Sequence, residues 1–362
     1  MINYRDFFGI EYPILQATMT HNGDWPLAAA ISEAGGLGVI MPNGHYTADW
    51  VDQQIINLKK HTSKPFSVAI FQRPWHVEKM YLKNCKDEDL KSEDHKYIIK
   101  NLEEGIKEAD KQLDVVLDHG VKVVQALASE PKERLVKLCK QKNVKILTKF
   151  HSYKGVDLKK VKALGADAVV LKGREAAGYI GRQPSLEQIT NIDKNVLPVI
   201  SSGGISTSED IQEHLDRGAM AVQIGTRFVC AKESSAHIKY KNIIINSSNE
   251  DVKISHDYWK KDYPRPTRAI MNEQSNKWMN EHLDILKKTE DNKISTNEAH
   301  QLLLRLPSKK NPRAGISEKL FDALTKGDIE NGPVMIGKNI NHITEQESVS
   351  DIMKKLTREL KI

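Results

Sequence analysis

The chain has 362 residues, of which 39% are hydrophobic and 28% charged, and its formal net charge is +6. This length fits two average domains or one large α/β barrel with additions. The positive charge is spread over lysine-rich segments, which argues against a nucleic-acid-binding surface. Cys85, Cys139 and Cys230 are too widely spaced for a disulfide framework, and no metal-binding spacing occurs. Because neither a signal peptide nor a membrane span is visible, we expect a soluble, cytoplasmic protein without a membrane partner.

Short apolar segments alternate with helical segments as far as residue 224. We predict eight strands, at residues 13–17, 37–41, 66–71, 121–125, 144–150, 168–171, 197–200 and 219–224. Helices are expected at residues 24–34, 49–60, 90–117, 130–142, 158–164 and 206–218. This alternation is typical of βα units, and eight strands favour a (β/α)₈ TIM barrel over an open sheet. No GxGxxG fingerprint follows the first strand, which argues further against a dinucleotide-binding fold.

Beyond Cys230 the pattern changes. Residues 236–315 are polar and lysine-rich, are interrupted by prolines, and have helical apolar spacing. We therefore predict a helical elaboration there, packed on a barrel formed by residues 1–235 and 316–362. A last helix at about residues 347–360 would complete the barrel.

Two glycine turns stand out in the stretch 195–230. Gly203-Gly204 follows the seventh predicted strand, and Gly225-Thr226 follows the eighth. Between them Ser206 is predicted to cap a helix, with Glu209 as its capping-box partner. Backbone N–H groups in such turns can hold a phosphate, and a TIM barrel carries its phosphate site after strands 7 and 8. We predict a phosphate site here, with ordinary turn chemistry as the alternative explanation of the glycines.

Several segments, in order along nearly the whole chain, carry a recognisable set of motifs. They are PILQATM at 13–19, AGGLG at 34–38, GADAVV at 165–170, GGI at 203–205 and QIGTRF at 223–228, with shorter matches at 268–270 and 326–338. Together these motifs resemble the nitronate monooxygenase (2-nitropropane dioxygenase) family. Its members are FMN-dependent TIM barrels, and their near relatives include an FMN-dependent enoyl-ACP reductase.

The resemblance implies FMN as the cofactor. It places the FMN phosphate at Gly203, Gly204, Gly225 and Thr226, next to Gln223 and Ile224 of the same motif. It also implies that Gln16, Ala17, Thr18 and Met19 line the flavin ring. For Gln16 the alternative is a polar residue at a strand end whose hydrogen bonds are satisfied within the protein.

After the sixth strand the chain departs from the family. The family has QGxEAGGHxG where residues 172–181 read KGREAAGYIG. Tyr179 replaces the histidine that acts as catalytic base or acid, and a phenol with a pKa of about 10 is a proton donor rather than a base at neutral pH. Tyr179 is our first catalytic candidate. A wall of the pocket without a proton role is the alternative.

Other substitutions alter the implied cofactor contacts. Lys172 replaces a glutamine and would place positive charge beside the flavin, with an ion pair to Glu175 as the alternative. Ala177 replaces a glycine next to Gly178, both among the implied cofactor-binding residues. Ala69 occupies the position of an FMN-contacting asparagine, and we consider Gln72 as its replacement.

Histidines elsewhere could supply the missing base. His151 follows the fifth strand and is our second catalytic candidate, with an exposed loop histidine as the alternative. His21 and His45 also follow barrel strands and are weaker candidates.

Three hypotheses for function remain. The leading one is oxidation of alkyl nitronates with O₂ by an FMN-dependent oxidoreductase. The second is reduction of an enoyl thioester with NAD(P)H, for which Tyr179 would donate the proton. The third is an FMN-binding barrel with little turnover. The expected partners are thus a small-molecule substrate with O₂ or NAD(P)H, and the oligomeric state, a homodimer included, stays open.

Overall fold

The computed structural model describes residues 3–42, 46–72, 91, 93–127, 130–255, 266–295, 298, 302 and 316–362. Its main sheet has eight parallel strands. They are β1 (Ile14–Gln16), β2 (Gly38–Ile40), β3 (Phe66–Phe71), β4 (Val123–Leu127), β5 (Lys145–Phe150), β6 (Ala168–Lys172), β8 (Val199–Ser202) and β9 (Ala221–Ile224). Their spatial order is β1-β9-β8-β6-β5-β4-β3-β2, and a parallel bridge between Leu15 and Leu37 joins the two ends. The predicted TIM barrel is confirmed.

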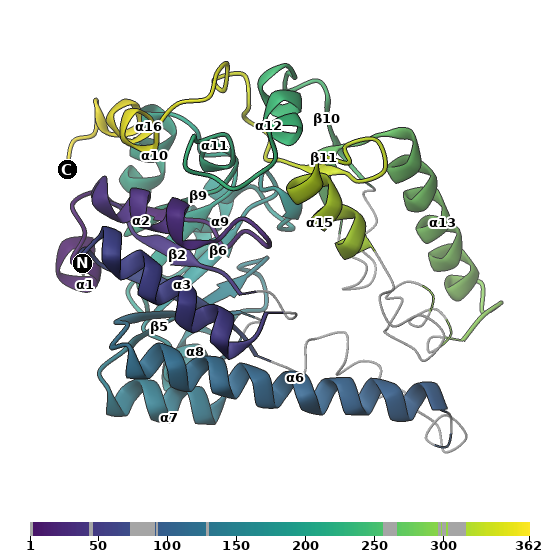
Figure 1. The fold of residues 1–362 in the computed structure, drawn as a ribbon, viewed down its shortest axis with the longest axis horizontal. Coiled ribbons are helices and arrows are strands. Elements are labelled where there is room, and N and C mark those ends of the chain that lie inside the picture. Colours follow the sequence, from purple (N-terminus) through teal and green to yellow (C-terminus); the bar gives the residue numbers. More distant parts are fainter. Residues whose placement is uncertain are drawn as a thin grey trace.

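Helices cover the outside of this barrel (Figure 1). They are α2 (Trp25–Glu33), α3 (Ala48–His61), α6 (Glu93–Asp118), α7 (Glu133–Gln141), α8 (Leu158–Ala163), α9 (Ser185–Asn191), α10 (Ser208–Asp216) and α16 (Val349–Thr357). The predicted closing helix is thus α16, which packs against α2 and α10. The short α1 (Tyr4–Phe8) covers the amino-terminal end of the barrel, because Tyr4 and Phe8 pack against interior residues such as Leu147.

The barrel interior is filled by layers of side chains, as this fold requires. An apolar layer lies towards the amino-terminal ends of the strands and contains Leu15, Leu37, Val123, Leu147, Val170 and Ile200. Above it is a polar layer. The Gln223 amide donates to Gln125 Oε1 (3.0 Å), and the Gln125 amide donates to Ser67 Oγ (3.0 Å). These side chains are at most 2% exposed, so the chain of hydrogen bonds satisfies polar groups that water cannot reach.

The cap of α10 differs from our prediction by one residue. Thr207 is the N-cap and forms a capping box with Asp210, whereas we assigned these roles to Ser206 and Glu209. The backbone N–H of Ser206 donates to the Asp210 carboxylate (2.8 Å). The sequence offers serine or threonine at three successive positions, 206–208, and local pattern alone cannot decide which of them is the cap.

We expected a helical segment after the barrel, but the structure has strands there as well as helices. Residues 236–315 contain α12 (Ile238–Ile245) and α13 (Glu273–Glu290), together with β10 (Val252–Ile254) and β11 (Thr267–Ile270). Helix α15 (Ile316–Lys326) and strand β12 (Val334–Met335) follow, within the residues that we assigned to the barrel. These strands form a small antiparallel sheet, which β7 (Gly178–Tyr179) of the barrel extends by pairing with β11. The sequence hides β10 and β11 because both are short and lie in a lysine-rich stretch. The division into a barrel and an added segment at these residues stays a prediction.

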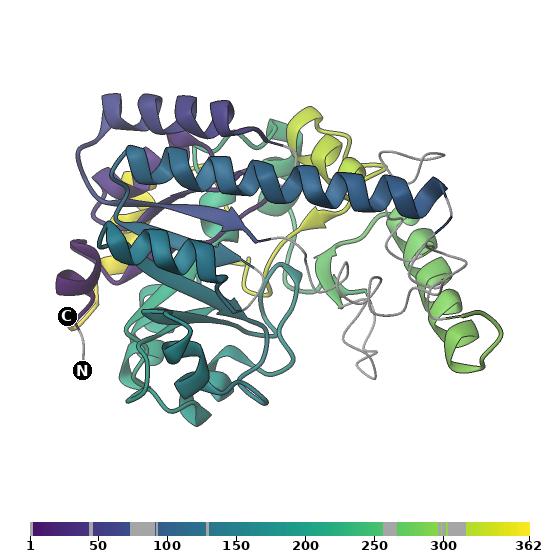
Figure 2. The same ribbon diagram turned by 90° about the horizontal axis from the view of Figure 1, so that it is seen from below.

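The two views show where the added segment lies. α13 projects from one side of the barrel, and α6 extends beyond the barrel on that same side (Figures 1 and 2). α1 and the carboxyl terminus lie on the opposite side in both views. Of the helices described, none combines the length and the apolar character that a membrane crossing requires.

Candidate active site

The two predicted glycine turns lie side by side, because β8 and β9 are neighbours in the barrel. Gly203 has φ +118° and Gly204 has φ +75°, a backbone that side chains disfavour. A Cβ on Gly203 would lie 2.9 Å from the backbone nitrogen of Ala176, and one on Gly204 would lie 2.6 Å from Glu175 Cβ. The turn therefore needs glycine at both positions for two reasons: its backbone conformation and the close approach of the loop that follows β6.

These turns offer unused hydrogen-bond donors. Gly225 is the N-cap of the short helix α11 (Thr226–Val229). Within the described residues, no acceptor lies within hydrogen-bond distance of the backbone N–H groups of Gly203, Gly204, Gly225 and Thr226. A group of N–H donors around turns without side chains is suited to a phosphate. The residues present thus fit the phosphate of a bound nucleotide cofactor.

A segment from the carboxyl-terminal part of the chain fastens the turns. The backbone N–H of Gly337 donates to Thr226 Oγ1 (2.9 Å), and that of Lys338 donates to the carbonyl of Glu175 (2.9 Å). The Asn339 amide donates to the carbonyl of Gly204 (2.6 Å). The motif at 326–338 does not predict the role of Asn339, because no local signal links this residue to a turn 135 residues earlier.

Residues after β1 face the second turn. A Cβ on Gly225 would lie 3.3 Å from Ala17 Cβ and 3.6 Å from Met19 Sδ. The backbone N–H of Ala17 donates to the carbonyl of Ile224 (2.8 Å). Ala17 and Met19 therefore lie against the Gly225 turn.

Two buried glutamines carry polar atoms without a protein partner. Gln16 accepts the backbone N–H of Val39 through Oε1 (3.0 Å), but its Nε2 has no partner in the described structure. Gln223 donates through Nε2, and its Oε1 has no partner in the same residues. A free amide donor and a free amide carbonyl on neighbouring strands match a heteroaromatic ring that bears both carbonyl oxygens and an N–H, as the flavin does.

The structure places one lysine at this site that we did not predict. Lys149 lies near the carboxyl end of β5, and its Nζ donates to Thr18 Oγ1 (2.6 Å). Burial, together with the charge of Lys172, lowers the pKa of Lys149 from 10.5 to about 7. The sequence did contain a signal for this lysine. Side chains alternate between the two faces of a strand, so Lys149, which follows Ile146-Leu147-Thr148, is expected on the interior face of β5.

The loop after β6 is held by its own network. Glu175 accepts the backbone N–H of Ser185 through Oε2 (2.9 Å). The Lys172–Glu175 ion pair, our alternative for Lys172, stays a prediction. Gly178 has φ +61° and open space where a Cβ would lie, and Ala177 lies beside Gly337.

The two catalytic candidates lie at the rim. Tyr179 is 45% exposed and sits in β7, opposite Thr267 of β11. His151 is half-buried directly after β5, and its carbonyl accepts the backbone N–H of Arg182 (2.8 Å), three residues beyond β7. The hydrogen bond ties the loop of His151 to the segment that follows β7. Their catalytic roles stay predictions.

The weaker candidates have structural surroundings of their own. Ala69 is fully buried in an apolar cluster with Val39 and Leu127. The side-chain amide of Gln72 forms hydrogen bonds with the backbone: it accepts from the N–H of Lys132 (2.7 Å) and donates to the carbonyl of Leu127 (3.4 Å). The ring of His21 packs edge-on against Phe321 of α15. His45 lies outside the described residues.

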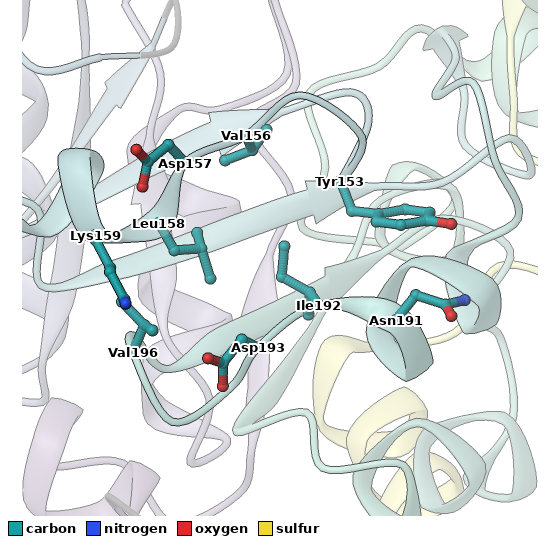
Figure 3. Close-up of a pocket in the computed structure, with 9 residues that line it drawn as sticks. All are labelled: Tyr153, Val156, Asp157, Leu158, Lys159, Asn191, Ile192, Asp193 and Val196. Carbon is teal, nitrogen blue, oxygen red and sulfur yellow. The ribbon is translucent and has the colours of Figure 1, made fainter.

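A separate surface pocket lies away from these residues. It has a volume of about 270 Å³ between the loop that precedes α8 and the end of α9, and Tyr153, Asp157, Lys159, Asn191 and Asp193 line it in part (Figure 3). None of our predicted site residues lines it. We therefore place the candidate site at the glycine turns.

Lys149 makes stability depend on pH. Its pKa is lower in the folded chain than in the unfolded one, so from about pH 7 to 10.5 the unfolded chain binds a proton that the folded chain does not. Stability should therefore rise with pH in this window, by at most about 1.4 kcal/mol per pH unit. We expect the free energy of unfolding, measured with urea between pH 7 and 9, to rise less steeply with pH in Lys149→Met. Lys145→Met, on the same strand, should leave the rise unchanged. Parallel curves for Lys149→Met and the unsubstituted chain would contradict the assignment.

The fold is a (β/α)₈ barrel, and the glycine turns at the carboxyl ends of its last two strands are a candidate phosphate site. A family model described as nitronate monooxygenase matches residues 3–359, and the chain belongs to this family of flavin-dependent oxidoreductases.

Curated relatives and solved structures are consistent with this family. A probable nitronate monooxygenase of Bacillus subtilis (strain 168) is 26% identical over 375 residues and covers 99% of both chains. A probable nitronate monooxygenase of Staphylococcus saprophyticus is 29% identical over 294 residues, 76% of this chain and 79% of the relative. FabK from Thermotoga maritima superposes with a TM-score of 0.73 at 27% identity, over 99% of this chain and 95% of that one. A nitroalkane oxidase from Streptomyces ansochromogenes shares the fold (TM-score 0.68, 24% identity, 98% and 97% coverage).

Proposed function

We propose that the chain binds FMN and oxidises alkyl nitronates with O₂. The observation that carries the proposal is the pair of glycine turns, whose unused N–H groups and close backbone approach suit a phosphate. Gly203, Gly204, Gly225 and Thr226 would hold that phosphate. When bound, FMN supplies the redox chemistry.

The chain's own residues would bind and orient the reactants. Ala17 and Met19 lie against Gly225, and Gln16 and Gln223 offer a free amide donor and a free carbonyl to the ring. A nitronate is already deprotonated and needs no base, so a tyrosine at position 179 is compatible with this reaction. Lys149 and Lys172 bring positive charge to the mouth of the barrel, which favours an anionic substrate.

Stopped-flow absorbance tests the proposal. Heat-denatured protein should release FMN, identified by chromatography, and ethyl nitronate should bleach the bound flavin under anaerobic conditions, with recovery on adding O₂. A protein that takes up no flavin would overturn the cofactor assignment. Flavin that no nitronate bleaches would overturn the reaction.

A second candidate is reduction of an enoyl thioester with NAD(P)H. It is favoured by Tyr179, because a phenol is a better proton donor than base at neutral pH. The same instrument separates the two reactions, since NADH would then bleach the flavin anaerobically and ethyl nitronate would not. A flavin that responds to neither would leave the chain a binding protein.

Tyr179→Phe tests the first catalytic candidate. If the hydroxyl donates a hydrogen bond or a proton to the reacting group, its loss should lower kcat/KM about tenfold to hundredfold. Tyr153→Phe is the matched control, because it removes a hydroxyl that bonds Glu187 (3.3 Å) beside the surface pocket. Steady-state kinetics with ethyl nitronate measure both variants. Equal kcat/KM in Tyr179→Phe and the unsubstituted chain would remove Tyr179 from the reaction.

A further inference from the structure

Lys149 reaches across the mouth of the barrel. In the order β1-β9-β8-β6-β5, three strands separate β5 from β1 on one side, and β4, β3 and β2 separate them on the other. The two strands are therefore diametrically opposite. Yet Lys149 Nζ lies 2.6 Å from Thr18 Oγ1, which follows β1. The ammonium group must lie over the open end of the barrel, above the polar layer of Gln125 and Gln223.

A lysine in this place is costly for the fold. Within the described residues no carboxylate pairs with Lys149, and the Thr18 hydroxyl accepts only one of its three N–H donors. The side chain of Lys149 is half-buried, and an ammonium that loses water without gaining an opposite charge is destabilising. A second positive charge on Lys172 of β6 adds to the cost. An apolar side chain would fill the same interior position at lower cost. The feature is therefore better explained by binding than by stability.

We propose that Lys149, with Lys172 and the Thr18 hydroxyl, forms the binding site for the negatively charged group of the substrate, a small nitronate or carboxylate anion. This inference rests on the proposed function, since it concerns the same barrel mouth. An anion here would supply the missing opposite charge and accept the remaining N–H donors of Lys149. It would also favour the protonated lysine, reversing the effect of burial on its pKa.

Anion binding to the flavin-loaded protein tests the proposal. The probes are sodium acetate and sodium nitrite, added at constant ionic strength and pH 6.5, with binding measured by calorimetry and by the flavin absorbance change. We expect Lys149→Met to weaken both anions at least tenfold while the flavin content stays unchanged. Lys149→Arg should keep most of the affinity, because it keeps the charge.

Lys145→Met is the matched control. Lys145 lies on the same interior face of β5 but at its amino-terminal end, with its ammonium 5.3 Å from the centre of the Phe7 ring. It should leave anion affinity unchanged. Equal affinity in Lys149→Met and Lys145→Met, or loss of the flavin in Lys149→Met, would overturn the inference.

The two proposals fail in different ways. If ethyl nitronate is not oxidised but anions still bind in a Lys149-dependent manner, the proposed reaction fails and the anion site stands. If ethyl nitronate is oxidised with the same KM in Lys149→Met and the unsubstituted chain, the reaction stands and the anion site fails.

Discussion

Gly204→Ala is expected to remove most of the bound flavin and to destabilise the protein by about 2–5 kcal/mol. The new Cβ would lie 2.6 Å from Glu175 Cβ, on a residue with φ +75°. The left-handed backbone alone costs about 1–2 kcal/mol for a residue with a side chain, and overpacking adds about 1–3 kcal/mol. Relief of the contact would push the loop after β6 away from the cradle. The ratio of flavin to protein absorbance and urea unfolding measure the two effects.

Gly155→Ala separates the backbone effect from the contact. Gly155 has φ +80°, almost that of Gly204, but nothing lies within 4 Å of its Cβ position. This variant should lose about 1–2 kcal/mol and keep its flavin. If both variants lost the same stability and both kept their flavin, the close approach at Gly204 would have no role in cofactor binding.

Arg227→Met is expected to cost about 3–5 kcal/mol, because it breaks a buried ion pair and leaves one partner behind. Arg227 Nη2 lies 2.5 Å from Glu347 Oε2, and the two side chains are 5% and 9% exposed. Arg227 also donates to the carbonyl of His342 (3.0 Å). Since Arg227 directly follows Thr226, losing these contacts should also loosen the phosphate turn and weaken flavin retention. Urea unfolding and flavin content are the measurements.

Arg217→Met provides the comparison. Arg217 pairs with Glu213 at 2.9 Å, but these side chains are 42% and 50% exposed, and exposed pairs contribute little. We expect a loss below about 0.5 kcal/mol. A similar loss in both variants would show that burial of the Arg227–Glu347 pair does not matter.

Acid titration gives a second check on Arg227. Burial acts to raise the pKa of Glu347, but the hydrogen bond from Lys355 and the charges of Arg227 and Lys355 lower it overall. A carboxylate with a lowered pKa stabilises the fold above its unfolded pKa, and this stability is lost as the pH falls. Without Arg227 the loss should begin at a higher pH. The midpoint of acid unfolding, followed by circular dichroism, should shift upwards in Arg227→Met.

The sequence alone determined the barrel and its two glycine turns. Period-two and helical apolar spacing and the glycines that end elements are local signals, so they predict the βα units and the turns at 203–204 and 225–226 without knowledge of distant contacts. The motif at 223–228 is likewise a local signal that can be read without knowledge of distant contacts. The elements missed include helix α9 and the strands β7, β10, β11 and β12. Strands β10 and β11 are three and four residues long and are stabilised by pairing with each other and with β7 and β12 rather than by their own residues.

Only the tertiary structure decided which side chains meet at the site. Lys149 and Thr18 are 131 residues apart, and Asn339 and Gly204 are 135 apart, so closure of the barrel and return of the chain bring them together. Gln72 was considered, from its position, as a replacement for a cofactor contact, yet its amide holds the backbone at Leu127 and Lys132. Periodicity predicts which face of an element is buried, but not which partner a buried polar group finds there, because that partner comes from another element. The charge at the barrel mouth was therefore set by the fold.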